Sequence, residues 1–79
     1  VDKNLGSVNA AFNAIILDKD NRQIGTCMDT PNNIAYAMKI NSNAEKVLGC
    51  FGESYMRKDM EARFFGLDEQ YHSTFVRYF

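Results

Sequence analysis

Two acidic residues and an amide stand close together between two apolar segments, in Asp18-Lys19-Asp20-Asn21-Arg22. Such oxygen-rich spacing could bind a cation. A calcium loop of the EF-hand type needs oxygen ligands at its first, third and fifth positions and glycine at its sixth. Counted from Asp18, the fifth position is Arg22, a cation, and the sixth is Gln23. We therefore interpret the segment as a solvated hairpin turn and predict no metal site.

The only histidine, His72, could in principle serve as a base for a cysteine nucleophile. No local motif supports such a pair, and no cluster of residues has the spacing of zinc ligands. The chain also lacks the glycine-rich phosphate loops of the Walker and Rossmann kinds. The sequence therefore predicts no catalytic residues, no cofactor and a protein that is not an enzyme.

The two cysteines, Cys27 and Cys50, could form one disulfide. The loop that this bridge closes is long enough for a stabilisation of about 3 kcal/mol. A domain of 79 residues needs such help, because so small a core rarely supplies more than ~3–5 kcal/mol. Two buried free thiols are the alternative. We predict the bridge, which favours a periplasmic or extracytoplasmic location, with a cytoplasmic location as the alternative.

The segment Gly49-Cys50-Phe51-Gly52 has the glycine spacing with which one RNA-binding fold clamps a phosphate backbone. It contains no basic residue, and the formal net charge of the chain is −1. Proteins held to nucleic acid by phosphate contacts normally carry a clear basic excess. We interpret the segment as a buried Cys-Phe pair with glycines for close packing, and we predict no nucleic-acid partner.

The composition is that of one folded globular domain spanning residues 1–79, with 46% hydrophobic and 24% charged residues. No apolar run approaches the ~18 residues of a membrane span, and no signal peptide is visible. Since the chain begins at Val1, we expect a processed product or an excised domain. Any contact with a membrane would then pass through a segment outside this chain.

The first half of the chain is expected to form a hairpin and a helix. Residues 1–9 are a polar lead-in or linker, 10–18 form a central strand covered on two sides, and 22–28 form its partner. Thr30 and Pro31 are typical of a helix N-cap and first position, which predicts a helix over 31–40. Alternation of apolar residues over 34–40 leaves a strand as the alternative.

The second half is expected to form a strand, a helix and a strand. Residues 46–51 favour a third strand, although Ser42 and Glu45 have the spacing of a capping box and leave a helix open. Met56, Met60 and Phe64 recur every four residues and predict a helix over 53–65. Ion pairs from Glu53 to Arg57 and from Asp59 to Arg63 would support it, and Gly66 would end it. Residues 71–79 form the last strand.

These elements predict an α+β fold, with an antiparallel sheet of three to five strands packed by one or two helices. The first hairpin, with its acidic Asn-containing turn and a second strand that includes Ile24-Gly25, resembles a hairpin of small PAS and Cache sensor modules. This hairpin occurs in many other folds, so it assigns no family.

Six phenylalanines, four tyrosines and four methionines are many for so small a core. They could simply fill the core; otherwise some would form a surface for an apolar ligand or a partner protein. The residues predicted for that surface are Met28, Tyr36, Met38, Phe51 and Phe75. We therefore expect a sensory or regulatory domain, such as the extracytoplasmic part of a membrane-anchored bacterial regulator. The alternative is a small soluble inhibitor or adaptor of the phage type that acts by protein contact.

Overall fold

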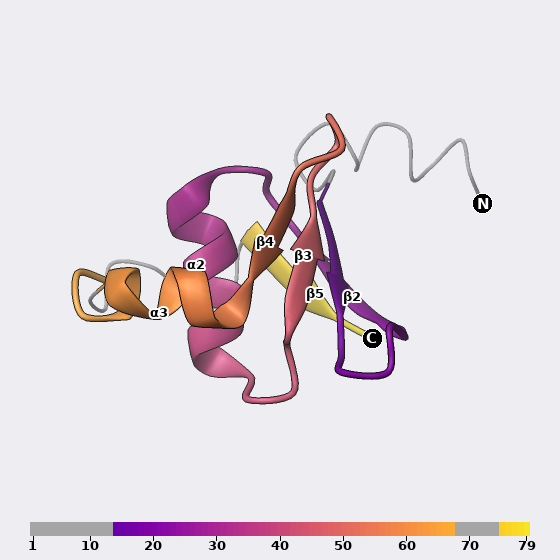
Figure 1. Cartoon of the computed structure of the whole chain (residues 1–79), viewed down its shortest axis with the longest axis horizontal. Coiled ribbons are helices and arrows are strands. Elements are labelled where there is room, and N and C mark those ends of the chain that lie inside the picture. The colour runs from indigo at the N-terminus through magenta and orange to yellow at the C-terminus, as the bar shows by residue number, and fades with distance from the viewer. Residues whose placement is uncertain (1–13, 68–74) are drawn as a thin grey trace.

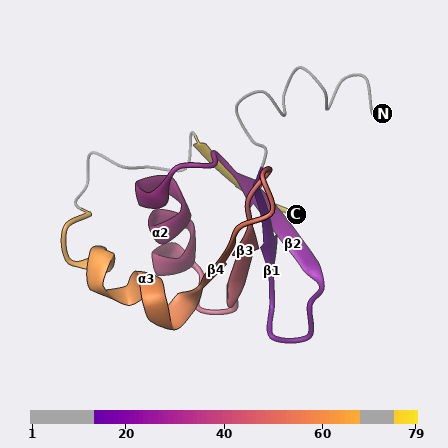
Figure 2. The same cartoon turned by 45° about the horizontal axis from the view of Figure 1, so that its top comes forward.

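The computed structural model of the chain describes residues 14–67 and 75–79. Five antiparallel strands form one sheet in the order β4-β3-β1-β2-β5, and two helices pack against one face of it (Figures 1 and 2). The predicted α+β fold is therefore confirmed. In chain order the elements are β1 (Ala14–Leu17), β2 (Gln23–Cys27), α2 (Pro31–Ile40), β3 (Lys46–Leu48), β4 (Ser54–Met56), α3 (Arg57–Phe64) and β5 (Val76–Tyr78).

The hydrophobic core lies between the sheet and helix α2. Register pairs Ile16 of β1 with Val47 of β3, and both side chains are fully buried. Helix α2 contributes Ile34 and Met38 to the same cluster, and β2 contributes Cys27. Since side chains alternate between the two faces of a strand, one set of residues from each strand faces the helices.

The central strand β1 is less covered on its second side than the sequence predicts. Ile15 lies between the buried residues Ala14 and Ile16 and points to the other face of the sheet, where it is 37% exposed. The prediction that β1 is central is confirmed, because β1 is the third of five strands. The prediction that it is covered on both sides is wrong at Ile15, because the helices pack on one face only (Figure 2).

The acidic segment between β1 and β2 is a turn, as predicted. Oδ1 of Asp18 accepts hydrogen bonds from the backbone N–H groups of Asp20 at 2.8 Å and Arg22 at 2.9 Å. Asn21 takes a φ of 63°, a left-handed conformation that asparagine tolerates better than most residues. The Asp18 side chain thus shapes the turn through its own backbone contacts.

Helix α2 begins where Thr30 and Pro31 predict. Oγ1 of Thr30 accepts a hydrogen bond from the N–H of Asn33, and Pro31 occupies the first turn, where it removes no helical hydrogen bond. Ile34, with Ala37 and Met38 on the same face, is fully buried. The helix prediction for residues 31–40 is confirmed and its strand alternative is wrong.

The predicted helix over residues 53–65 begins later than expected. Residues Ser54–Met56 form strand β4, which pairs with Lys46–Leu48, and helix α3 starts only at Arg57. A spacing of four residues cannot distinguish the two, because side chains four positions apart lie on one face of a strand as well as on one face of a helix. The long-range pairing with β3 decides the outcome, as tertiary contacts commonly override local propensity.

The ion pairs predicted for this helix also differ from those in the structure. Since Glu53 lies before β4, it is not on a helix with Arg57. Arg57 instead pairs with Glu61, with 3.7 Å between Nε and Oε2, at the same spacing one turn later. The apolar stripe is kept in part: Met60 is buried and Phe64 is partly buried against the core.

Strand β5 lies along the outer side of β2, far from the strand that precedes it in sequence (Figure 1). The approach is close at Gly25, where a Cβ would lie 2.9 Å from Cδ1 of Tyr78 and would also meet the carbonyl oxygen of Arg77. The hydroxyl of Tyr78 donates to the carbonyl oxygen of Ala37, which ties β5 to α2. The last-strand prediction is confirmed for residues 76–78.

Some predictions fall on residues outside the described ranges. These are the lead-in at residues 1–9, the first part of the strand at 10–18, His72 and the first part of the last strand. In the described ranges, neither helix is long and apolar enough to cross a membrane.

Candidate functional site

One exposed turn of the sheet lies between β3 and β4, at residues 49–53, and we call it the β3–β4 tip. It projects from the end of the sheet opposite the β1–β2 turn (Figure 1). The N–H of Gly49 donates to the carbonyl of Glu53 at 2.7 Å, and the N–H of Gly52 donates to the carbonyl of Gly49 at 3.1 Å. Gly52 has a φ of 93°, which side chains rarely permit. Phe51 at its apex is 84% exposed.

A carboxylate from another part of the chain holds the tip in place. Asp29 lies just after β2, and its Oδ2 accepts a hydrogen bond of 3.0 Å from the N–H of Cys50. A Cβ added at Gly49 would lie 2.7 Å from Oε1 of Glu53 and 3.2 Å from Oδ2 of Asp29. Because Gly49 has no side chain, the carboxylates of Glu53 and Asp29 can both lie close to its backbone.

The two carboxylates make the base of the tip electrically negative. The pKa of the Cys50 thiol is raised above its ordinary value, chiefly by its hydrogen bond to Asp29. The pKa of Tyr55 is raised by partial burial and then by the charges of Glu53 and Asp29. Both shifts have the direction expected where negative charge disfavours a further anion.

The interpretation of residues 49–52 as a buried Cys-Phe segment is wrong. Cys50 and Phe51 are both exposed, because the two glycines form a turn between strands instead of packing against the core. The glycine spacing itself was the available signal, since Gly-x-x-Gly between two strand-like segments is also typical of a hairpin loop.

The predicted disulfide is also wrong, because Cys27 and Cys50 are both free thiols. Cys27 belongs to the buried face of β2, whereas Cys50 lies on the exposed tip beyond β3. Strand β1 separates β2 from β3 in the sheet, so the chain does not bring the two residues together. Burial raises the pKa of the Cys27 thiol to about 12, with a smaller contribution from the charge of Asp29. Cys27 therefore belongs to the core as a neutral side chain.

Of the five residues predicted for an apolar surface, one does not reach the surface. Met38 is fully buried in the core, and Tyr36 is half-buried on the same helix. Met28 and Phe75 are neighbours, since the N–H of Met28 donates to the carbonyl of Phe75 at 3.0 Å, and Phe75 is partly exposed. Phe51 alone stands on the β3–β4 tip.

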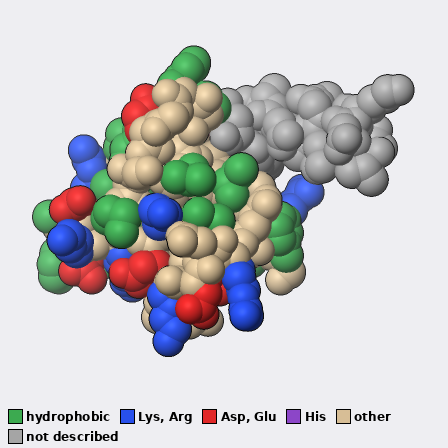
Figure 3. Space-filling view, turned by 45° about the vertical axis from the view of Figure 1, so that its right-hand side comes forward, with side chains coloured by type: hydrophobic (Ala, Val, Ile, Leu, Met, Phe, Trp, Pro, Cys, Tyr) green, Lys and Arg blue, Asp and Glu red, His purple; other side chains and the backbone are tan. Residues whose placement is uncertain are grey.

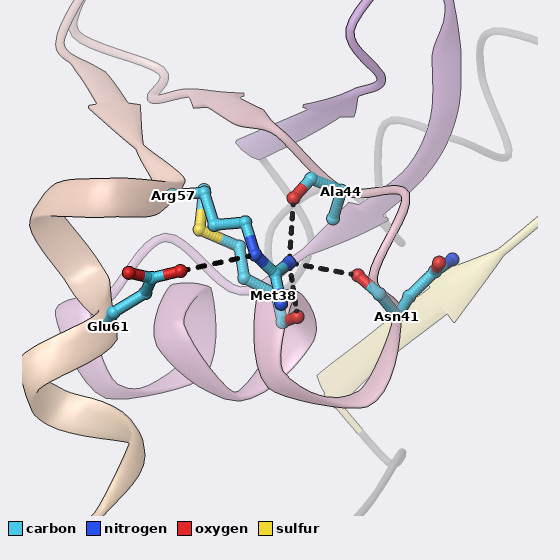
Figure 4. A network of polar contacts seen from close by, with 5 residues as sticks. All are labelled: Met38, Asn41, Ala44, Arg57 and Glu61. Atoms are coloured by element: carbon cyan, nitrogen blue, oxygen red, sulfur yellow. Dashed lines mark hydrogen bonds and ion pairs between the residues drawn. The ribbon is translucent and has the colours of Figure 1, made fainter.

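Arg57, at the start of α3, is a structural side chain rather than a ligand-binding cation. Its Nη1 donates to the carbonyl oxygens of Met38, Asn41 and Ala44 at 2.8, 3.2 and 3.0 Å (Figure 4). These carbonyls end helix α2 and begin the loop after it, where backbone acceptors lack helical partners. The guanidinium also lies 5.4 Å from the ring centre of Phe64, a cation–π contact.

Lys39, in the last turn of α2, makes the reciprocal contact. Its Nζ donates to the carbonyl oxygens of Phe64 at 3.1 Å and Leu67 at 2.8 Å, at the end of α3. Each helix therefore ends against a cation supplied by the other. Sequence reasoning missed both residues, because their partners are backbone atoms far away in the chain and leave no local pattern.

Two of the grooves on the surface formed by residues 14–67 and 75–79 are open. One, of about 500 Å³, runs between the β1–β2 turn and the loop after α2, and it mixes carboxylates with aromatic rings. Its carboxylates and rings belong to Asp18, Asp20, Glu45, Tyr78 and Phe79. The other, of about 640 Å³, lies beside α3 and is lined by Lys39, Arg57, Glu61, Phe64 and Phe65. Neither is an enclosed cavity of the kind that surrounds a small ligand.

No group of three or more His, Cys, Asp or Glu side chains within residues 14–67 and 75–79 is arranged to hold a metal ion. The geometry of the β3–β4 tip instead suits physical contact: an exposed ring on a hydrogen-bonded turn, with carboxylates at its base. Comparison with family models, curated proteins and solved structures finds no match to this chain.

Proposed function

We propose that this chain is a non-enzymatic module that acts by contact with a partner protein. The observation that carries the proposal is that three phenylalanines are each more than three-quarters exposed. Phe51 is 84%, Phe65 95% and Phe79 77% exposed, although phenylalanine is among the residues most often buried. The core between the sheet and the helices is filled by other side chains. Exposed aromatic rings are enriched where proteins bind each other.

Within this proposal a soluble inhibitor or adaptor is the first candidate. For the sensory domain expected first from the sequence, the disulfide is the main support for a periplasmic location, and the two cysteines are free. The two described grooves are open, which supports protein contact more than capture of an apolar small molecule. A small ligand remains the competing occupant, and native mass spectrometry of the purified protein would detect it as an added mass.

Affinity capture from cells of the source tests the proposal. The bait is compared with a triple variant, Phe51→Ala, Phe65→Ala and Phe79→Ala, and with a control that removes three exposed polar side chains by Asp20→Ala, Lys58→Ala and Asp59→Ala. We expect proteins that are retained by the wild type and the control and lost with the aromatic variant. Sedimentation velocity shows whether a second copy of the chain is one of them. Equal retention by all three baits contradicts the proposal.

A further inference from the structure

We propose that the β3–β4 tip is the anchor of this interaction: it inserts Phe51 into an apolar pocket of the partner, and the rim of that pocket is basic. This inference rests on the proposed function and names the surface and the chemistry of the partner. It selects one of the three exposed phenylalanines over the other two.

The backbone of the tip that carries the ring is held in place before binding. Two backbone hydrogen bonds join Gly49 to Glu53 and Gly52 to Gly49, and the contact from Asp29 to the N–H of Cys50 fixes the apex from outside the hairpin. An anchor that is already ordered loses less conformational entropy on binding. Phenylalanine at such a position has the large apolar surface of a binding hot spot.

The two charged side chains that the described part of the structure places at the tip are both acidic. Glu53 follows the apex and Asp29 approaches from the end of β2, and residues 49–55 contain no lysine or arginine. Neither carboxylate has an ion-pair partner among the described residues. In Figure 3 hydrophobic and acidic side chains are both exposed at this end of the molecule. Complementary charge at an interface steers encounter and excludes wrong partners, so the matching rim carries arginine or lysine.

Phe65 provides an internal comparison. It is more exposed than Phe51, but it lines the groove beside α3 together with two cations, Lys39 and Arg57, and one carboxylate, Glu61. Because the cations outnumber the carboxylate there, a partner with a basic rim would be favoured less at Phe65 than at the β3–β4 tip. Comparing Phe51 with Phe65 therefore tests whether binding needs acidic surroundings in addition to an exposed ring.

The test is site-specific photo-crosslinking in cells of the source. A photoreactive phenylalanine, p-benzoylphenylalanine, replaces Phe51 in one variant and Phe65 in another, after thermal melts confirm that both fold. We expect an ultraviolet-dependent adduct with a protein at position 51 and none with that protein at position 65. Mass spectrometry of the adduct should place the crosslink at an apolar site with arginine or lysine beside it.

The identified partner is then purified and titrated. Phe51→Ala should raise Kd at least about tenfold, as expected of a hot spot. The charge-neutral pair Asp29→Asn and Glu53→Gln, which keeps an acceptor for Cys50, should raise Kd by about threefold or more at low salt and less at high salt. The control pair Asp20→Asn and Asp59→Asn, at exposed sites away from the tip, should leave Kd unchanged.

The outcomes are distinguishable. An adduct at position 65 without one at position 51 overturns the anchor and leaves the proposed function standing. Adducts at neither position contradict both. If the adduct at position 51 maps to an acidic site of the partner, the basic rim is wrong. It is also wrong if the partner binds the Asp29→Asn, Glu53→Gln variant and the Asp20→Asn, Asp59→Asn variant with the same Kd.

Discussion

Nη1 of Arg57 lies 2.8 Å from the carbonyl oxygen of Met38, so the first residue of α3 caps the last turn of α2. The same nitrogen reaches two more carbonyls, and Lys39 caps α3 in return. The two helices are therefore joined by charged hydrogen bonds as well as by apolar packing.

Replacing Arg57 by alanine should destabilise the protein by about 2–3 kcal/mol. Hydrogen bonds to a charged group contribute about 1.5–3 kcal/mol, and the carbonyls it leaves are partly buried. Urea melts measure the change, with the exposed Arg63→Ala as the matched control expected to stay within about 0.5 kcal/mol. Equal losses for the two arginines would show that the contacts of Arg57 add nothing.

Met60→Ala should cost about 2–5 kcal/mol, because Met60 is buried between α3 and the core. Lys58→Ala, two residues earlier on the same helix, is exposed and should be nearly silent. Chemical denaturation of the two variants checks this. A silent Met60 change would mean that α3 does not pack through that face.

Replacing Asp18 should lower stability more than replacing Asp20, and neither residue should bind calcium. Asp18→Ala loses two hydrogen bonds in the turn and should cost about 1 kcal/mol, while the exposed Asp20 makes no such side-chain contact. Thermal melts compare the variants, and a calorimetric titration of the wild type should show no calcium binding below the millimolar range. Sub-millimolar binding that is lost in Asp20→Ala would overturn the assignment of this segment as a plain turn.

The two thiols should differ in reactivity. In the folded protein iodoacetamide should label Cys50, which is exposed, and should label Cys27 only after unfolding. Asp29→Asn weakens the hydrogen bond that chiefly raises the pKa of Cys50 and removes the smaller effect of the Asp29 charge, so the thiolate fraction rises and labelling becomes faster. Intact mass before and after labelling gives the count and the rate. An unreduced protein lighter by two hydrogens would show that the cysteines are bridged after all.

Stability should fall in alkaline solution. The unfolded Cys27 thiol ionises near 9.0, while its pKa in the folded protein is about 12. Between these values the folded state holds a proton that the unfolded state has lost, so the free energy of unfolding falls by about 1.4 kcal/mol per pH unit for this group. Below pH 9 the thiol is protonated in both states and contributes no slope.

Tyr78 adds a second contribution of the same sign above pH 10, because burial raises its pKa as well. Urea melts from pH 8 to 11.5 should therefore show a slope that is shallower in Cys27→Ala and, above pH 10, shallower in Tyr78→Phe. Slopes that are the same in all three proteins would mean that neither group is protected from ionisation by folding.

Local chemistry was enough to predict the first hairpin and the helix that follows. Asp18 and Asn21 form their turn with neighbouring backbone atoms, and Thr30 caps a helix three residues away. Signals of this kind are contained in a few consecutive residues, which is why a single sequence suffices to detect them.

Several of the failures involve partners that are distant in the chain. Residues 54–56 form a strand because they pair with β3. Cys50 lies far from Cys27 because β1 separates β2 from β3, and its N–H donates to Asp29 instead. Arg57 and Lys39 act on backbone carbonyls, which every residue has. No spacing in the sequence marks which carbonyls will be near, so these two helix caps, like the contact between Asp29 and Cys50 at the tip, could be found only in the folded chain.

The position of β5 has a consequence for the order in which the molecule assembles. The β1–β2 and β3–β4 hairpins each close a short loop, whereas β5 pairs residue 78 with residue 25 across both helices. Closing the longer loop loses more chain entropy, and the pairing of β5 with β2 that compensates for this loss can form only after the rest of the sheet exists. We therefore expect the two hairpins to form early and the outer strand to join last. In reverse, β5 would be the first to detach, which exposes the edge of β2 and the buried Cys27 while the rest of the sheet stays intact.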